Sequence, residues 1–120
     1  MWLTDAELAY LRTQYLGRLA SVDPHGNVQN NPVGFVINRE LRTIDVGGAN
    51  LAQTKKFRNV KAGSTVALVV DDLASVNPWR PRMVEIRGTA EALEDVDPPR
   101  KGMSREIIRI HPEWVKSFGF

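Results

Sequence analysis

The stretch Thr65-Val66-Ala67-Leu68-Val69-Val70 is a nearly continuous run of apolar residues, most of them β-branched. Such a run favours a strand that is buried on both faces. The segment from Met83 to Leu93 alternates instead, with Val84 and Ile86 on one face and charged residues on the other. A period of two predicts a long strand with one solvated face. Residues 71–81, between the two segments, are predicted to form a loop.

Four further strands are predicted around these two. Pro32 lies inside one of them, and because proline cannot donate a ladder hydrogen bond it marks an edge, a bulge or a break. Pro112 is predicted to end the last strand of the chain. The first three strands form a meander joined by turns rich in Asp, Asn, Pro and Gly. The predicted ranges are Arg18–Val22, Val28–Ile37, Thr43–Gly47 and Arg105–Ile110.

Two short helices complete the prediction. Thr4-Asp5-Ala6-Glu7 is a capping box that starts a helix over residues 5–15, and Gly17 is predicted to end it in a left-handed conformation. Asn50 is the predicted N-cap of a second helix over residues 51–61. Because six short strands with short links favour an antiparallel sheet, and closure removes the edges of a sheet, we predict a small β-barrel with peripheral helices.

Composition restricts the class of protein. The 120 residues fit a single domain, 1–120, with a formal net charge of +2, which is too mild to indicate nucleic-acid binding. The lack of cysteine excludes a disulfide scaffold, a thiol nucleophile and an iron–sulfur cluster, and two histidines leave little for a metal site, so no metal is expected. No apolar run approaches the roughly 20 residues of a membrane span, and no signal-peptide pattern opens the chain. We expect a cytoplasmic protein without a membrane partner.

The strongest local signal for function is the predicted helix over residues 51–61, which is basic and has no acidic residue. A helix start after Gly47-Gly48 offers free backbone N–H groups, and with Thr54 and the lysines it predicts a phosphate site. A solvated basic helix face is the alternative interpretation. Nucleic acid is disfavoured because the cations fall on different sides of the helix. These cations are Lys55, Lys56, Arg58 and Lys61.

A second signal is the segment Asn77-Pro78-Trp79-Arg80-Pro81-Arg82. Its two prolines stiffen the backbone, and guanidinium groups flank the tryptophan. Such a segment can stack on a planar ligand and hold anions. The alternative interpretation is a core or interface tryptophan beside two solvated arginines.

No other motif supplies chemistry. The chain has neither a G-x-x-x-x-G-K-[ST] loop nor a G-x-G-x-x-G turn. His25 lies in a predicted turn and His111 precedes a proline, so neither indicates a catalytic triad. Asp71 and Asp72 are interpreted as capping or ion-pairing residues. We assign no catalytic side chain, a profile that suits a protein whose cofactor carries the reaction while the protein binds and orients it.

Ordered blocks over most of the chain carry a resemblance to a known family. The blocks are Gly17–Asp23 with Gly26, Asn31–Phe35, Ile44–Gly48, Thr54–Val60, Val70–Val76, Pro78–Arg80 and Val84–Ala90. In these blocks the chain resembles the pyridoxamine 5'-phosphate oxidase-like split β-barrel flavoproteins. Within them it is most similar to the actinobacterial deazaflavin (coenzyme F-420)-dependent oxidoreductases, in the subgroup that includes tetracycline-pathway enone reductases.

The resemblance implies a homodimeric, six-stranded antiparallel split β-barrel of the FMN-binding type, with two cofactor sites at the dimer interface. It implies coenzyme F-420 as cofactor, with FMN as the alternative, and hydride transfer to an electron-poor double bond of a small organic molecule. The implied cofactor-binding residues are Lys56 first, then Lys55, Thr54 and Arg58 at the phosphate, Asn31, Pro32 and Val33 along the ring, and Trp79, Arg80 and Arg82 from the partner subunit.

Two alternatives remain beside this expectation. One is an FMN-binding oxidoreductase of the same fold. The other is a protein without catalytic activity, either a carrier of a flavin, deazaflavin or haem-type ligand or a regulatory binding module. The triplet Arg109-Ile110-His111 superficially matches the Arg-x-His substrate motif of true pyridoxamine phosphate oxidases. Pro112 follows it and the rest of that motif is absent, so pyridoxamine phosphate is not the expected substrate.

Overall fold

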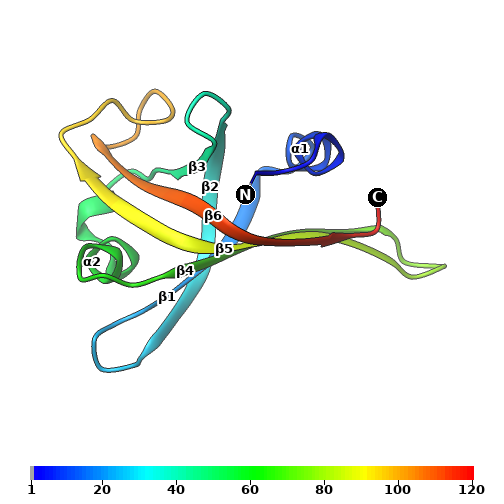
Figure 1. The fold of residues 1–120 in the computed structure, drawn as a ribbon, viewed down its shortest axis with the longest axis horizontal. Coiled ribbons are helices and arrows are strands. Elements are labelled where there is room, and N and C mark those ends of the chain that lie inside the picture. The colour runs from blue at the N-terminus through cyan, green and yellow to red at the C-terminus, as the bar shows by residue number, and fades with distance from the viewer. Residues whose placement is uncertain (1) are drawn as a thin grey trace.

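Six antiparallel strands close into a barrel in the computed structural model, which describes residues 2–120 (Figure 1). The strand order around the barrel is β1-β2-β3-β6-β5-β4, so two three-stranded meanders join through the β1–β4 and β3–β6 pairs. This arrangement confirms the predicted antiparallel barrel with peripheral helices. The elements are α1 (Asp5–Leu11), β1 (Leu16–Val22), β2 (Val28–Asn38), β3 (Thr43–Val46), the 3-10 turn η1 (Leu51–Gln53), α2 (Lys55–Lys61), β4 (Val66–Ser75), β5 (Arg80–Glu94) and β6 (Glu106–Phe118).

The first helix begins as predicted and ends earlier than predicted. The Thr4 hydroxyl accepts the Glu7 N–H at 3.1 Å, and the Glu7 carboxylate accepts the Thr4 N–H at 2.8 Å, which is the capping box. The helix ends at Leu11, and Gly17 lies inside β1 opposite Val33 instead of capping the helix. The glycine serves the strand packing instead, because a Cβ on Gly17 would lie 2.8 Å from a methyl carbon of Leu68.

The core fills the inside of the barrel, and β4 contributes alternate residues to it. Val66, Leu68 and Val70 are buried, whereas Ala67 and Val69 are half-buried on the opposite side. The prediction that this strand is buried on both faces is therefore wrong for the single chain. The side chains of the core that are buried to 1% exposure or less include Leu11, Leu19, Ile44, Val46, Leu51, Leu68, Val70, Val84, Ile86, Ile108 and Ile110.

A row of paired side chains crosses the sheet on the face opposite this core. Ala20 pairs with Ala67, Ala67 with Arg87, and Arg87 with Trp114, so these side chains lie side by side on four neighbouring strands. Because directly paired residues point to the same face, the row faces away from the barrel core. We call this side of β2, β1, β4, β5 and β6 the outer face.

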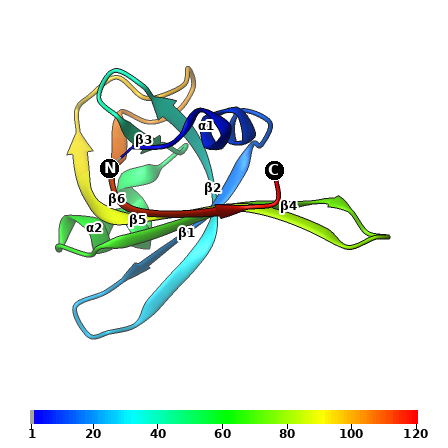
Figure 2. The ribbon, with the colours of Figure 1, turned by 45° about the vertical axis from the view of Figure 1, so that its right-hand side comes forward.

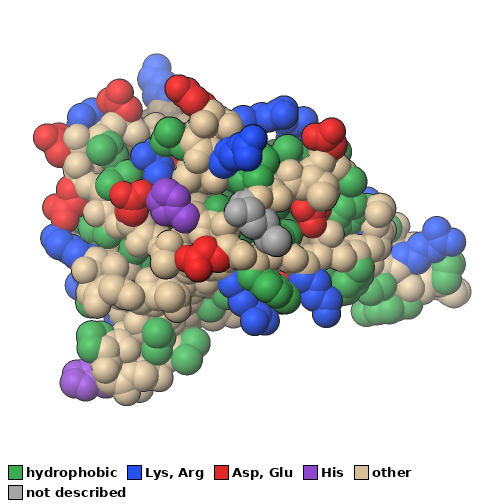
Figure 3. Space-filling view, in the orientation of Figure 1, with side chains coloured by type: hydrophobic (Ala, Val, Ile, Leu, Met, Phe, Trp, Pro, Cys, Tyr) green, Lys and Arg blue, Asp and Glu red, His purple; other side chains and the backbone are tan. Residues whose placement is uncertain are grey.

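The predicted loop over residues 71–81 is wrong, because most of it continues the two flanking strands. Asp71 pairs with Met83 and Asp72 with Arg82, and β4 ends only at Ser75. The result is a hairpin, residues 71–82, that projects beyond the barrel in both views of the ribbon (Figures 1 and 2) and in the space-filling view (Figure 3). We call this hairpin the arm.

The last strand also runs further than predicted, through Pro112 to Phe118. Gly88 pairs with Pro112 while Arg87 pairs with Trp114, so Glu113 is the extra residue of a β-bulge. A bulge accommodates a residue that cannot donate a ladder hydrogen bond, and Pro112 therefore does not end the strand.

Asp72 joins the base of the arm to α1. Its carboxylate accepts the Tyr10 hydroxyl at 2.9 Å, two N–H groups of Arg82 at 2.9 and 2.5 Å, and the Gln14 amide at 3.3 Å. The hydrogen bonds from Arg82 lower the pKa of Asp72, and burial together with Asp72 raises the pKa of Tyr10 well above its usual value. The Tyr10 ring also stacks on Phe120 with the ring centroids 4.7 Å apart. Asp71 and Asp72 were interpreted as capping or ion-pairing residues, and the structure shows ion pairs, of Asp71 with Arg18 and of Asp72 with Arg82.

Removing the Tyr10 hydroxyl tests this connection. The Tyr10→Phe variant is expected to lose about 1–2 kcal/mol of unfolding free energy, because a hydrogen bond to a charged acceptor is lost while the ring stays in place. Urea denaturation measures the loss. Tyr15→Phe is the control, since the Tyr15 side chain is 81% exposed and its hydroxyl is expected to contribute almost nothing. If the two variants were equally stable, the hydrogen bond from Tyr10 to Asp72 would not contribute to the stability of the fold.

Candidate functional site

The basic helix α2 starts four residues later than the predicted second helix. Residues 51–53 form the short turn η1, and the N-cap of the α-helix is Thr54, whose hydroxyl accepts the Phe57 N–H at 3.3 Å, not Asn50. The Thr54 hydroxyl also donates to the Leu51 carbonyl at 2.6 Å. Thr54 therefore holds the start of the helix, and Lys55 and Lys56 occupy its first turn.

The cations of α2 differ in what they contact. Lys55 is exposed and lies 3.4 Å from the Asp23 carboxylate, Arg58 donates to the Gln53 carbonyl at 2.8 Å, and Lys61 pairs with Glu94 at 2.5 Å. Lys56 is half-buried and has no carboxylate within 4 Å anywhere in residues 2–120. Burial lowers the pKa of its ammonium group, which nothing in the described chain offsets. Lys56 is thus the cation best placed for an external anion.

Asp23 explains why Lys55 is the less available of the two lysines. Its buried carboxylate accepts the backbone N–H groups of Asn27 and His25, each at 2.9 Å, and the Asn27 side-chain amide at 3.1 Å. These hydrogen bonds, those from Asn27 above all, lower the pKa of Asp23 to about 2. Asp23 is therefore ionised at neutral pH and attracts the Lys55 ammonium group.

The first half of β2 has a free edge, as Pro32 suggested. Residues 28–34 pair with β1 alone, and β3 pairs only from Phe35 onward. Two side-chain oxygens on this half-strand, Gln29 Oε1 and Asn31 Oδ1, are buried and accept no hydrogen bond. Buried acceptors without a donor cost free energy, so they indicate a place where a donor is supplied from outside.

The two oxygens lie on the same side of the sheet as α2. Gln29 pairs with Ser21 across the β1–β2 ladder, and Asn31 pairs with Leu19, so all four share one face. Asn59 of α2 donates to the Ser21 hydroxyl at 3.0 Å on that face. We call Lys56, Gln29 and Asn31 the candidate site. A ligand with an anionic group and N–H or O–H donors fits these residues.

The other predicted site residues fall into two groups. Pro32 and Val33 lie beside Asn31 on the same half of β2, and Val33 is buried. Trp79 and Arg80 lie on the arm, which points away from α2 (Figures 1 and 2). A single chain therefore does not bring Trp79 and Arg80 together with Lys56. Arg82 is held by Asp72 and lies over the Tyr10 ring at 5.2 Å, so it is engaged within its own chain.

Sequence reasoning missed Gln29. The available signal was the alternation along β2, since Gln29 lies two residues before Asn31 and therefore on the same face of the strand. None of the residues next to Gln29 in the sequence indicated that it belongs to a binding site. Only the pairing with Ser21, which contacts α2, places Gln29 next to the basic helix.

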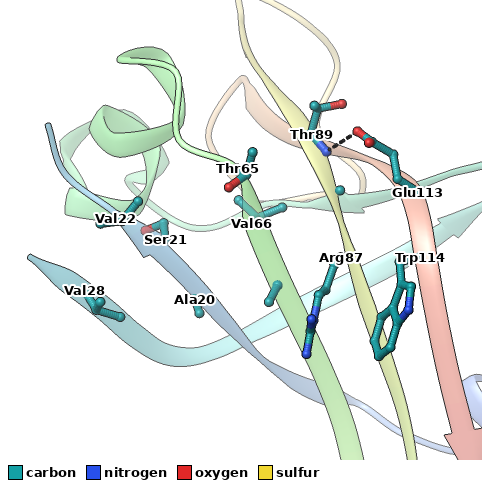
Figure 4. A pocket seen from close by; sticks show the side chains of 12 residues that line it. Ala20, Ser21, Val22, Val28, Thr65, Val66, Arg87, Thr89, Glu113 and Trp114 are labelled. Carbon is teal, nitrogen blue, oxygen red and sulfur yellow. Dashed lines mark hydrogen bonds between the residues drawn. The ribbon is translucent and has the colours of Figure 1, made fainter. Parts of the chain in front are cut away.

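The outer face carries a cavity that the sequence did not predict. It has a volume of about 460 Å³ and is open between β1, β4, β5 and β6 (Figure 4). Arg87 stacks on Trp114 at 4.3 Å along one wall, and the Thr89 N–H donates to Glu113 at 3.1 Å. The opposite wall is apolar and includes Ala20 and Val28, whose side chain is 76% exposed.

Two more hollows continue this cavity toward the arm. A cavity of about 250 Å³ shares Ala20 and Ala67 with the first, and one of about 620 Å³ shares Arg18 and Val69 with the second. Leu73, Trp79 and Phe118 line the last of them and are each at least 41% exposed. A chain of partly apolar hollows thus runs along the outer face from Val28 to the arm.

The described residues supply no evident catalytic group. No cluster of three or more His, Asp or Glu residues in residues 2–120 is arranged to hold a metal ion. Within the same range, no helix has the length and apolar character needed to cross a membrane. His111 is 2.6 Å from Glu91, and Arg109 makes two hydrogen bonds to Asp45, each at 3.1 Å. The Arg-x-His triplet is therefore engaged inside the chain.

Comparisons with known proteins agree with this fold. The family model described as pyridoxamine 5'-phosphate oxidase matches residues 3–119. A 5a,11a-dehydrotetracycline/5a,11a-dehydrooxytetracycline reductase of Streptomyces rimosus is 42% identical over 99% of this chain and 84% of the relative. A protein of Lactobacillus delbrueckii that is named for pyridoxamine 5'-phosphate oxidase has a TM-score of 0.72 and 26% identity, over 96% of this chain and 93% of its own. An F-420 reductase shares the fold with a TM-score of 0.63 and 23% identity, over 86% and 90% of the two chains. The chain belongs to the pyridoxamine 5'-phosphate oxidase family.

Proposed function

We propose that this protein is an oxidoreductase that uses reduced coenzyme F-420 to reduce an electron-poor double bond of a small organic molecule. The observation that carries the proposal is that Lys56, which is half-buried and has no carboxylate partner in residues 2–120, belongs to α2, the helix that lies on the same side of the sheet as the unsatisfied oxygens of Gln29 and Asn31. The relative from Streptomyces rimosus, which is named as a reductase, supports the class of reaction. The fold shared with an F-420 reductase supports the choice of cofactor.

The chemistry of the candidate site fits such a cofactor. Deazaflavin and flavin cofactors both carry a phosphate, which suits Lys56, and N–H and O–H donors, which suit the two oxygens on β2. When bound, the cofactor supplies the hydride. The protein binds and orients it through Lys56, Gln29 and Asn31, and the buried Val33 beside them keeps that side of β2 dry.

A second copy of the chain completes this proposal. The row of Ala20, Ala67, Arg87 and Trp114 and the hollows beside it leave apolar surface open, and an open apolar surface of this kind favours association. Trp79 is 66% exposed at the tip of the arm, beyond the reach of its own α2. In a dimer formed through the outer face, the arm of the partner reaches the other chain, so its tryptophan can close that chain's candidate site.

An acidic residue on the outer face is expected to prevent this dimer. Val28→Glu places a charge in the first outer-face cavity, and because Val28 is 76% exposed the fold of the single chain is not disturbed. Sedimentation equilibrium is expected to give a dimer for the wild type and a monomer for this variant. Leu41→Glu is the control, since Leu41 is 52% exposed in the β2–β3 turn and lines none of the outer-face cavities. A wild-type monomer, or dimers of both variants, would overturn the assignment of this face.

Titration with coenzyme F-420 and separately with FMN tests the cofactor. Binding is followed by quenching of the fluorescence of Trp2, Trp79 and Trp114. Tight binding of F-420 and weak binding of FMN would support the proposal, and oxidation of reduced F-420 by enone substrates would then be measured. Preference for FMN would move the protein to the flavin-dependent branch of the family. If neither binds, the redox proposal is wrong and the likeness concerns the fold alone.

A further inference from the structure

A cavity between α1 and β2 differs in charge from the other hollows of the described chain. It measures about 290 Å³ and lies beyond Gly34, at the point where β2 stops pairing with β1. The outer-face cavities and a fourth cavity near Asp45 each include at least one Asp or Glu side chain in their walls. The cavity at α1 includes two arginines and no acidic residue.

The two arginines are Arg12, at the C-terminal end of α1, and Arg100, in the loop between β5 and β6. Neither forms an ion pair with a carboxylate within residues 2–120. Arg100 donates one N–H to the Phe35 carbonyl at 3.3 Å, which holds its guanidinium group over the strand and leaves other N–H groups free. Their positive charge is therefore not neutralised inside the cavity.

Most of the other residues that line the cavity are apolar or aromatic, in contrast to the two arginines. Leu11 and Phe35 form an apolar floor, with exposed fractions of 1% and 6%. Tyr15 forms a wall with its ring almost fully exposed, at 81%. An apolar floor, an aromatic side chain at the edge and two guanidinium groups suit a planar ring that carries an anionic oxygen.

We propose that this cavity binds a small planar molecule that carries a carboxylate. The ring lies against Leu11 and Phe35, and the carboxylate accepts hydrogen bonds from Arg12 and Arg100. Guanidinium groups suit this role because their N–H groups match the two oxygens of a carboxylate. The proposal does not depend on the redox reaction, since the cavity shares no residue with the candidate site.

Calorimetric titration with salicylate, in the absence of any cofactor, tests the proposal. Salicylamide is the comparison probe, because it has the same ring without the charge. We expect salicylate to bind and salicylamide to bind at least about tenfold more weakly, in line with the cost of losing a charge-assisted hydrogen bond. In NMR spectra, salicylate is expected to shift the backbone amide signals of residues 11–15 and 35–37.

Two variants and one control locate the binding. Arg12→Gln and Arg100→Gln are each expected to weaken salicylate binding by about tenfold. Arg105→Gln is the matched control, because Arg105 pairs with Asp95 and Asp97 and lies outside the cavity. The proposal is overturned if salicylate does not bind, if salicylamide binds equally well, or if all three variants bind salicylate like the wild type.

Discussion

Replacing Gly88 with alanine is expected to unfold the barrel or to leave it barely stable. A Cβ at this position would lie 1.9 Å from the His111 carbonyl oxygen and 3.0 Å from its carbonyl carbon. Both are backbone atoms of β6, opposite the bulge where Gly88 pairs with Pro112, so no side-chain rotation relieves the clash. The two strands must separate, and they form the longest ladder of the barrel. We expect a loss of more than about 3 kcal/mol, from a total that is only about 5–15 kcal/mol for a domain.

The matched control is another glycine inside a strand. A Cβ on Gly34 in β2 would meet no atom within 4 Å. Gly34→Ala is therefore expected to change the unfolding free energy by less than about 1 kcal/mol, because the gain from a stiffer unfolded chain is small. Urea denaturation followed by circular dichroism measures both variants. If Gly88→Ala were as stable as Gly34→Ala, the inference that β5 and β6 lie too close at the bulge to admit a Cβ would be wrong.

The strands were predictable where hydrophobic pattern alone decides, and not where pairing overrides local signals. Val66, Leu68 and Val70 mark a core strand by their spacing. Asp71 and Asp72 resemble turn residues, yet they continue the strand because Arg18 and Arg82 on neighbouring strands neutralise them. These partners lie 53 and 10 residues away in the sequence, so no local rule places them.

Pro112 is a second position where a residue on another strand overrides the local signal. Proline in a strand normally signals its end, because it lacks the N–H that a ladder needs. The strand continues here because Gly88, on a different strand, has no Cβ and permits a bulge at this point. The sequence contains both residues, but only the register of β5 against β6 brings them together.

The candidate site was predictable as a set of residue types and not as a set of contacts. The basic segment with Lys55 and Lys56 was visible, and so was Pro32 as a mark of an edge, which the structure shows on the first half of β2. Which lysine is available depends on Asp23, which lies 32 residues before Lys55 and reaches it through the turn after β1. The prediction that Trp79 contributes to the same site requires a second chain, because the arm carries it away from α2 in its own chain.

Replacing Lys56 with alanine is expected to weaken coenzyme F-420 binding by about tenfold to a hundredfold. The reason is that a charge-assisted hydrogen bond contributes roughly 1.5–3 kcal/mol, and removing the ammonium group loses it entirely. Lys56 has no carboxylate partner among residues 2–120, so no described carboxylate competes with the phosphate. Fluorescence titration measures the dissociation constant of the variant and the wild type.

Lys61→Ala is the control on the same helix. Lys61 lies at the other end of α2 and pairs with Glu94, so its removal is expected to change the dissociation constant by less than about twofold, as for an exposed ion pair. Lys55→Ala is expected to fall between the two, because Asp23 holds its ammonium group at 3.4 Å. If the Lys56 and Lys61 variants bound F-420 with equal affinity, Lys56 would not be the residue that binds the phosphate.

The dependence of binding on pH separates the charge of Lys56 from its bulk. Burial lowers the pKa of Lys56, so in the free protein this ammonium group loses its proton at a lower pH than an exposed lysine does. Only the protonated form attracts the phosphate, and bound phosphate in turn favours that form. The affinity of the wild type for F-420 is therefore expected to fall as alkaline pH rises through the pKa of Lys56. The alanine variant has no such group and is expected to lack this fall, whereas a merely structural role for Lys56 would leave the two pH profiles parallel.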